Sequence, residues 1–276
     1  MVVYKASDLA AVTKQTLSKG NQIKYLAGAK WIKCDTLGYE SLVEVLASQI
    51  CEQLNFDHVD YQLCQITDGY SCKNACISED FSQGLVEVSL GSLIEQLAGY
   101  IIDLSRYHSI ADRVLAVYEP LQDLIEYDVF LQYLNKLISL DAVLFNEDRH
   151  LYNIGFLVDE SSLKPAPIFD CGAGLLSDSS IDYPFEMPIE VCLHRIKAKP
   201  FSTSFRKQVH FFNTLCECPF STKSISIDLA DLENVYSTKV LDRALNVLKV
   251  GLQLFDIELK FKMGKPGMHT SVFNPA

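Results

Sequence analysis

The segment from Asn146 to Asn153 reads NEDRHLYN and is densely polar between two apolar blocks. It places a carboxylate at Asp148 and an amide at Asn153, with a spacing of five residues. Amide and carboxylate oxygens can hold Mg²⁺ against phosphate oxygens, and a separate carboxylate can orient an attacking hydroxyl. The residue types and their spacing therefore favour phosphoryl transfer.

A second motif, Pro167–Gly172 (PIFDCG), is an apolar strand pattern that ends in an acid and a glycine. The residues that follow Asn153 are also apolar and predict a strand over 154–158. We expect the two strands to form a hairpin whose open end presents Asn153 and Asp170 to one metal ion. Either motif alone is weak evidence, but together they point to a metal and phosphate site.

A long helical pattern over residues 121–145 leads directly into this polar loop. Asp141 lies on its apolar stripe, so we expect a hydrogen-bonded acid that supports the loop rather than a catalytic one. His150 is interpreted as a brace of the loop through a backbone hydrogen bond. Arg149 is predicted to face either phosphate or solvent.

The N-terminal part predicts strands and one helix. Residues 22–34 read as two strands around a glycine turn, and 39–54 carry apolar residues at helical spacing.

Further along the chain, strand patterns change to helical ones after Phe81. This order predicts an α+β protein with a small sheet-rich lobe, a larger helical lobe and a cleft between them. The further expected strands are 59–67 and 71–77, around the turn Asp68-Gly69, and the further expected helices are 90–104, 110–117, 202–215 and 237–255.

Composition excludes several classes of protein. The 276 residues include 35 acidic and 24 basic ones, a net charge of −11, which works against a broad surface for nucleic acid or anionic lipid. No stretch has the roughly 18 unbroken apolar residues of a membrane span, and the start lacks the features of a secretory signal. We expect a cytoplasmic protein, with secretion as an effector left open. The nine cysteines are expected to be reduced and mostly buried.

The two motifs resemble those of the HipA-like Ser/Thr kinases, which are bacterial proteins. The resemblance rests on 146–157 (NEDRHLYNIGFL) and 166–172 (APIFDCG), with weaker matches at 29–34 and 43–48. It implies a bilobal protein-kinase-like fold, related to phosphatidylinositol kinases, with an N-lobe over residues 1–80 and a C-lobe over 81–276.

The resemblance also implies ATP and Mg²⁺ as cofactors and assigns roles by position. Asp148 would be the catalytic acid/base residue, while Asn153 and Asp170 would be metal ligands. Lys33 would place its charge on the α- and β-phosphates, provided that a carboxylate from the following helix holds it. Glu44 is the best partner, and Glu40, one turn earlier, is the alternative.

The Gly-rich phosphate loop of many kinases is absent from this chain. Ser18 and Gly20 are the candidates for phosphate contact in its place. The adenine is expected near the lobe junction, at Ile77, Ser78 and Glu79, and His150 completes the candidate nucleotide-binding residues.

Three interpretations follow. The first is an ATP-dependent kinase that acts on Ser/Thr hydroxyls of a protein substrate and is capable of phosphorylating its own chain. The second is a small-molecule or lipid kinase, because fold does not fix the acceptor. The third is a pseudokinase that binds nucleotide or a protein partner without transfer; the missing Gly-rich loop favours it, and the retained acid and metal ligands oppose it.

Overall fold

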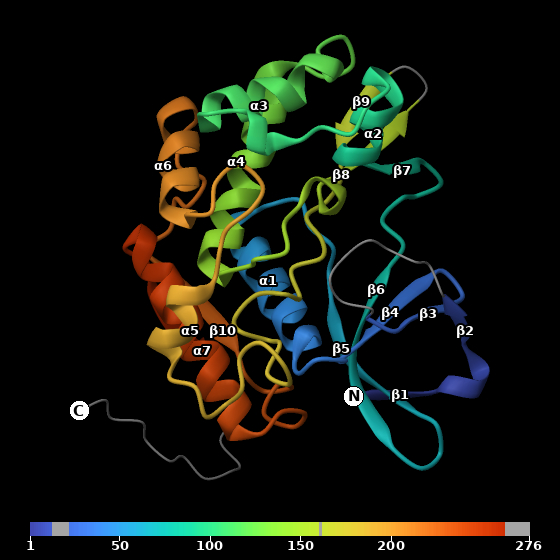
Figure 1. The fold of residues 1–276 in the computed structure, drawn as a ribbon. Helices are drawn as coiled ribbons and strands as arrows, with labels where there is room; N and C mark the ends of the chain where they lie inside the picture. The colour runs from blue at the N-terminus through green and yellow to red at the C-terminus, as the bar shows by residue number, and fades with distance from the viewer. Residues whose placement is uncertain (13–21, 160–161, 263–276) are drawn as a thin grey trace.

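A six-stranded sheet forms the N-terminal part of the computed structural model, which describes residues 1–12, 22–159 and 162–262 (Figure 1). The first two strands in spatial order are parallel, and the other neighbours are antiparallel. The order is β1 (Val2–Lys5), β5 (Gln62–Thr67), β6 (Cys72–Glu79), β4 (Lys30–Cys34), β3 (Lys24–Ala27) and β2 (Ala10–Val12).

Both predicted turns of this sheet are present. Gly28 joins β3 to β4 with φ of 66°, a conformation that an L side chain rarely adopts. Between β5 and β6, the carboxylate of Asp68 accepts the backbone N–H groups of Tyr70 and Ser71. The edge strands β1 and β2 were not predicted, because short exposed strands carry little pattern.

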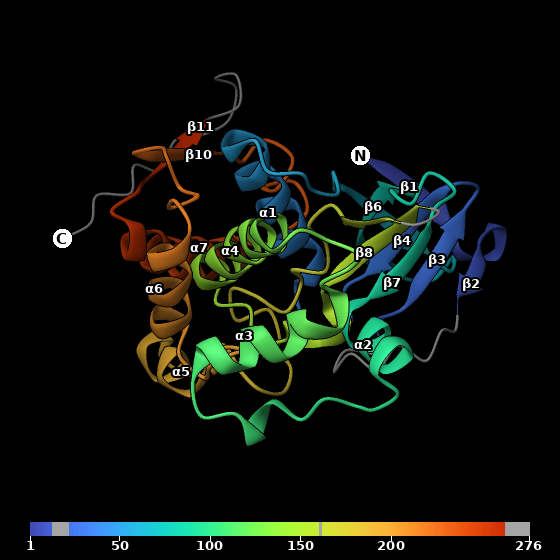
Figure 2. The same cartoon turned by 90° about the horizontal axis from the view of Figure 1, so that it is seen from above.

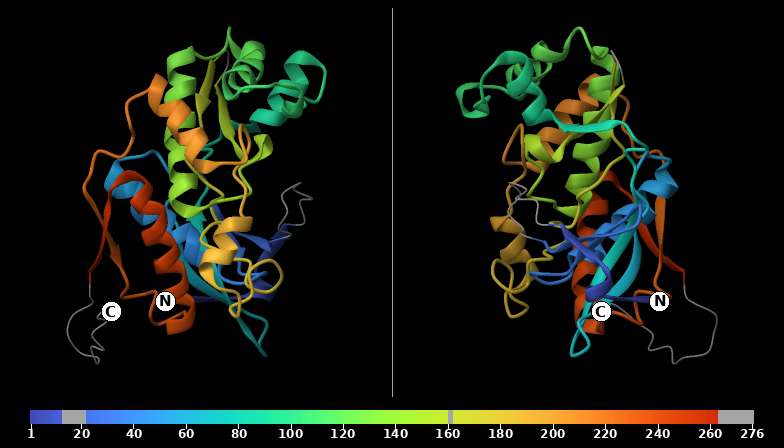
Figure 3. Two further views of the ribbon diagram at one scale, coloured as in Figure 1. Left: turned by 60° about the vertical axis from the view of Figure 1, so that its left-hand side comes forward. Right: turned by 90° about the vertical axis from the view of Figure 1, so that its right-hand side faces the viewer.

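The rest of the chain is mainly helical, and its longest helix, α4, lies in the middle (Figures 2 and 3). The helices α1, α6 and α7 pack against α4 and bury it in one large apolar core. The helices are α1 (Glu40–Leu54), α2 (Leu90–Ala98), α3 (Ile110–Tyr118), α4 (Tyr127–Leu144), α5 (Ile189–Arg195), α6 (Phe205–Leu215) and α7 (Thr238–Leu252). Short 3-10 turns cover Ala6–Asp8, Leu104–Arg106, Glu119–Leu121, Leu151–Asn153 and Gln253–Phe255.

Two small sheets complete the described fold. The antiparallel one has β8 in its centre, and the parallel one joins two distant segments. Their strands are β7 (Val86–Ser89), β8 (Gly155–Asp159) and β9 (Ser162–Pro165), and then β10 (Ser224–Asp228) and β11 (Glu258–Lys262).

The structure differs from the predicted elements at three places. The helix expected over 90–104 ends at Ala98, because Gly99 takes a left-handed conformation with φ of 76° and stops it. The helix expected over 121–145 begins only at Tyr127. The strand expected over 167–169 is wrong: β8 pairs with β9, and Ile168 makes only an isolated bridge to His58.

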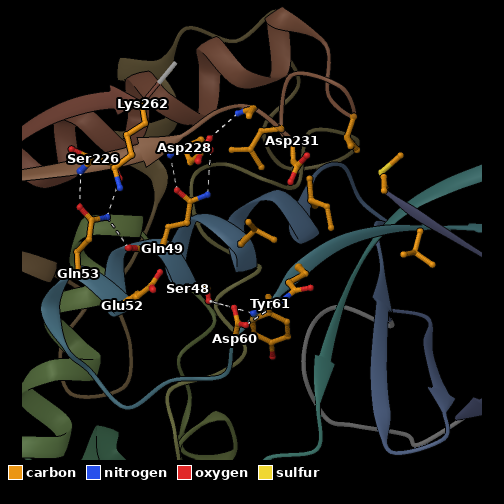
Figure 4. Close-up of a pocket in the computed structure, with 18 residues that line it drawn as sticks. Ser48, Gln49, Glu52, Gln53, Asp60, Tyr61, Ser226, Asp228, Asp231 and Lys262 are labelled. Carbon is orange, nitrogen blue, oxygen red and sulfur yellow. Dashed lines mark hydrogen bonds between the residues drawn. The ribbon is translucent and has the colours of Figure 1, made fainter. Parts of the chain in front are cut away.

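Helix α1 is attached to β10 by two glutamine side chains (Figure 4). Gln49 accepts from the backbone N–H of Asp228 at 2.8 Å and donates to its carbonyl at 3.2 Å. Gln53 does the same with Ser226, at 2.8 and 2.9 Å. The two carboxamides therefore satisfy backbone groups along the β10 edge that does not pair with β11, and they fix α1 against this strand.

The junction of β4 with α1 is organised by Asp35. Its carboxylate accepts the backbone N–H of Ser41 and the hydroxyl of Tyr236, each at 2.7 Å. Burial raises the pKa of Asp35 to about 7, although these hydrogen bonds oppose the shift. One carboxylate thus joins β4, the first turn of α1 and the loop before α7.

This pKa predicts a pH dependence of stability. Because the folded-state pKa of Asp35 exceeds the ordinary value of 3.8, the folded protein binds the proton more tightly, and stability from this group falls as the pH rises from about 4 to about 7. We expect Asp35→Asn, which does not titrate, to remove about 3 kcal/mol of the decline between pH 4.5 and 7.5. Urea unfolding at pH 4.5 and 7.5 measures it. The exposed Asp123→Asn is the control, and an equal slope in the parent and Asp35→Asn would contradict the prediction.

Two expectations about the whole chain can be compared with the structure. All nine cysteines are free thiols, and six of them are buried, as predicted. Within the described ranges, no helix combines the length and apolar character that crossing a bilayer requires.

Candidate active site

The polar loop is closed on itself by Asn153. The Nδ2 of Asn153 donates to the carbonyl of Asp148 at 2.9 Å, and its backbone N–H donates to the carbonyl of His150 at 2.9 Å. The N–H of His150 donates to the carbonyl of Asp148 as well, at 2.8 Å. These bonds bring Asp148 and Asn153 close together, and they leave the amide oxygen of Asn153 for another partner.

A buried ion pair holds this loop to α4. Arg149 is fully buried, and its Nε and Nη2 donate to the two carboxylate oxygens of Asp141 at 2.9 and 3.1 Å. Its Nη1 donates to the carbonyls of Asn153 and Phe169, at 2.7 and 2.9 Å. Burial would lower the pKa of Arg149, but Asp141 raises it above the usual range. The supporting role predicted for Asp141 is confirmed, with Asn146 Nδ2 donating to it at 2.7 Å.

Arg149 therefore corrects the expectation that it faces phosphate or solvent. Its guanidinium lies in the interior and joins three segments: the end of α4, the polar loop and the residues before Asp170. The local sequence could not reveal this, because the carbonyl of Phe169 comes from a segment 20 residues away.

Lys33 stands between two carboxylates. Its Nζ lies 2.8 Å from Oε1 of Glu44 and 2.9 Å from Oδ1 of Asp170, and its side chain is 10% exposed. Burial opposes the charge on Lys33, but Asp170 and Glu44 hold its pKa well above the usual value. Burial would also raise the pKa of Asp170, yet Lys33 lowers it, so that this carboxylate is ionised. The predicted pairing of Lys33 with Glu44 is present.

The alternative partner, Glu40, has a different task. Its carboxylate accepts the backbone N–H groups of Thr36, Leu37 and Gly38, and it therefore stabilises the turn before α1. The second oxygen of Glu44 accepts the N–H of Cys171 at 2.9 Å. Glu44 thus orders both Lys33 and the backbone next to Asp170.

Asp170 is presented by a bend rather than by a strand end. Its φ is 59°, in the left-handed region that Asp and Asn tolerate better than most residues. Before it, Phe169 stacks on Phe81 with ring centroids 5.3 Å apart. The predicted convergence of Asn153 and Asp170 on one cavity is present, but it comes from this bend and not from a hairpin.

Asp148, Asn153 and Asp170 line one cavity of about 520 Å³. A larger cavity of about 670 Å³, lined in part by residues of α1 and β10 (Figure 4), contains none of the predicted site residues. The described ranges hold no group of three or more His, Cys, Asp or Glu side chains placed for a metal ion. An ionised Asp170 and the amide oxygen of Asn153 nevertheless fit a hard cation such as Mg²⁺, which usually takes one or two protein ligands together with waters and phosphate.

Other predicted nucleotide contacts lie elsewhere. Ile77, Ser78 and Glu79 line a separate cavity of about 230 Å³, and Glu79 pairs with Lys30. Ser18 and Gly20 lie outside the described residues.

His150 braces the loop through its backbone, whose N–H and carbonyl bond to Asp148 and Asn153. Its ring takes no part, since both ring nitrogens are buried and have no hydrogen-bond partner among the described residues. Its Nε2 lies 4.0 Å from Oδ2 of Asp148. Burial lowers the pKa of His150.

Sequence reasoning missed two side chains beside the polar loop. Lys199 Nζ lies 3.3 Å from Oδ1 of Asp148, and the hydroxyl of Tyr183 donates to Glu147 at 2.9 Å. Lys199 is 51 residues from Asp148, and no motif surrounds it, so no sequence signal could have found it.

Solved structures provide the comparison with known proteins. The proinflammatory kinase CtkA of Helicobacter pylori is 17% identical with a TM-score of 0.61, and the alignment covers 88% of this chain and 94% of that one. HipA from a Shewanella oneidensis complex with HipB and operator DNA is 14% identical with a TM-score of 0.36, over 91% of this chain and 65% of that one. No protein-family model and no curated protein matches the chain. The predicted likeness to HipA-like kinases is thus confirmed at the level of the fold: the chain has the α+β, protein-kinase-like fold seen in CtkA.

Proposed function

We propose that the chain is an ATP- and Mg²⁺-dependent protein Ser/Thr kinase that can also phosphorylate itself. The observation that carries the proposal is the arrangement of Asp148, Asn153 and Asp170 around one cavity, with Lys33 bonded to Asp170. The kinase fold shared with CtkA supports it. These are the parts that phosphoryl transfer needs, and the closed loop and the buried ion pair hold them in place.

Asp148 is the proposed base. The acceptor hydroxyl oxygen forms a bond to the γ-phosphorus while the bond from that phosphorus to the bridging oxygen of ADP breaks, and the hydroxyl proton passes to the carboxylate of Asp148. Asp148 lines the cavity, its side chain is 11% exposed, and its main chain is fixed from both sides.

Lys33 is the proposed contact to the α- and β-phosphates, and Glu44 holds it. Asn153 and Asp170 would hold Mg²⁺, which, when bound, neutralises charge on the phosphate oxygens. The ammonium of Lys33 lies 2.9 Å from Asp170, one of the two residues that would hold the metal ion. Lys33, which precedes α1 in the chain, and Asn153 and Asp170, which follow it, would therefore act on the same phosphate chain.

The remaining assignments complete the proposal. Residues 1–80 would be the N-lobe and 81–276 the C-lobe, with adenine near Ile77, Ser78 and Glu79 at their junction. His150 would lie beside the nucleotide, close to Asp148. The cytoplasm, where ATP is abundant, is the proposed place of action.

The test is transfer from γ-labelled ATP. Purified protein is incubated with Mg²⁺ or with EDTA, alone and with model proteins, lipid vesicles or small hydroxyl compounds, and labelled residues are identified by phosphoamino acid analysis. We expect Mg²⁺-dependent phosphoserine or phosphothreonine in the parent and in Asp123→Asn, an exposed control, and loss in Asp170→Asn. Nucleotide binding without transfer would indicate a binding module, and label only in lipid or small molecules would indicate another acceptor. Either result would overturn the protein-kinase proposal.

A further inference from the structure

A lysine from a distant segment faces the proposed base. Lys199 lies between α5 and α6, and its Nζ is 3.3 Å from Oδ1 of Asp148. The side chain of Lys199 is 38% exposed, whereas that of Asp148 is 11% exposed. The ammonium therefore lies beside the buried base, on a side chain that is itself more exposed to solvent.

The segment that carries Lys199 is anchored in the core. Gln208 of α6, which is 1% exposed, donates to the carbonyl of Lys199 at 3.2 Å and accepts the N–H of Phe201 at 2.9 Å. The carbonyl of Phe201 accepts from Arg113 at 2.7 Å, and the Phe201 ring is fully buried. Because the backbone on both sides of Pro200 is fixed, the ammonium is presented from a defined position and not from a free loop.

The cavity beside Asp148 has a mainly acidic lining, so a phosphate group there needs a neighbouring cation. The described residues that line it include one lysine, Lys24, on the side of the six-stranded sheet. An ATP tail and the phosphoryl group in transfer both carry negative charge, and Lys33, held by Glu44 and Asp170, is already assigned to the α- and β-phosphates, so that the group in transfer needs another cation. The acidic lining residues are Glu40, Glu147, Asp148, Asp170, Asp178 and Asp182.

The polar loop itself supplies no such cation. The residue two positions after Asp148 is a histidine, His150. The guanidinium of Arg149 is paired with Asp141 in the interior. Lys199 is the ammonium that lies within 4 Å of Asp148 in the described ranges.

We propose that Lys199 is a catalytic residue whose ammonium contacts the phosphoryl group while it passes from ATP to the hydroxyl. This inference rests on the proposed function. In the step, the hydroxyl oxygen bonds to the γ-phosphorus, the bond to the ADP oxygen breaks, Asp148 takes the hydroxyl proton, and Lys199 keeps its own protons and donates hydrogen bonds to the equatorial phosphoryl oxygens. Its pairing with Asp148 places it within reach of both.

Lys199→Met, Lys199→Arg and the exposed Lys197→Met test the inference, with kcat and KM for ATP measured on the same labelled acceptor. Removing one charged donor to the transition state should lower kcat by about 100-fold in Lys199→Met, with KM for ATP within about threefold of the parent. Lys199→Arg keeps the charge and should turn over at least about tenfold faster than Lys199→Met. Lys197→Met should match the parent, and the melting temperatures of all four proteins should agree.

Three results would overturn it. Equal kcat in the parent and Lys199→Met would show that the ammonium does not assist transfer. Equal loss in Lys199→Met and Lys199→Arg, accompanied by a lower melting temperature, would show a packing role only. Absence of transfer by the parent would overturn the proposed function together with this role, so the two failures are distinguishable.

Discussion

Asp148→Asn should slow phosphoryl transfer by about 10²- to 10⁴-fold, because an amide cannot take the hydroxyl proton. The substitution keeps the size of the side chain. The loop is held through the carbonyl of Asp148, which accepts from Asn153 and from the N–H of His150, so its shape does not depend on the carboxylate. Initial rates with γ-labelled ATP at saturating Mg²⁺ measure the effect, and calorimetric titration with a non-hydrolysable ATP analogue should show affinity within about threefold of the parent.

Asp123→Asn, an exposed position outside the cavity, is the matched control and should keep the parent rate. A rate in Asp148→Asn within a factor of two of the control would remove Asp148 from the mechanism. Loss of analogue binding in Asp148→Asn would instead mean that the carboxylate serves binding.

Arg149→Met should destabilise the folded protein by about 3–5 kcal/mol. The change leaves Asp141 as an uncompensated buried charge and removes the donors to the carbonyls of Asn153 and Phe169. The free energy of unfolding from urea titration, read by circular dichroism, measures the loss. The same variant should also lose transfer activity, because the loop and the bend at Asp170 share this guanidinium.

Arg206→Met on the exposed face of α6 is the control and should change stability by less than about 0.5 kcal/mol. The double variant Arg149→Met with Asp141→Asn should be more stable than Arg149→Met alone, since the buried charge is gone and Asn146 keeps an acceptor. A loss below about 1 kcal/mol in Arg149→Met would show that the ion pair does not hold the site together.

The part of the site that sequence could predict is the part set by local spacing. Asp148 and Asn153 are close because one short loop closes on itself, and Lys33 and Glu44 meet because a strand leads directly into a helix. The apolar stripe around Asp141 likewise indicated a partnered acid. In each case, the partners lie within about one turn or one hairpin of each other in the chain.

The remainder depends on approaches between distant segments. Asp170 contacts Lys33 across 137 residues of sequence, and a left-handed bend presents it. A strand was expected there, because an apolar run before an acid is compatible with either conformation. Lys199 and Gln208 carry no pattern, and their roles arise only from the packing of α6 on α4. The interior position of Arg149 is also a product of packing.

The attachment of α1 to β10 has a consequence for how the proposed kinase could be regulated. Many protein kinases are switched by swinging the helix that carries the glutamate partner of the lysine. Here such a swing would break the four hydrogen bonds that Gln49 and Gln53 make to Asp228 and Ser226, and it would pull a 1%-exposed Glu44 out of the core. With α1 fixed in this way, the proposed kinase would be constitutively active, and its output would depend on its amount and on the substrates it encounters.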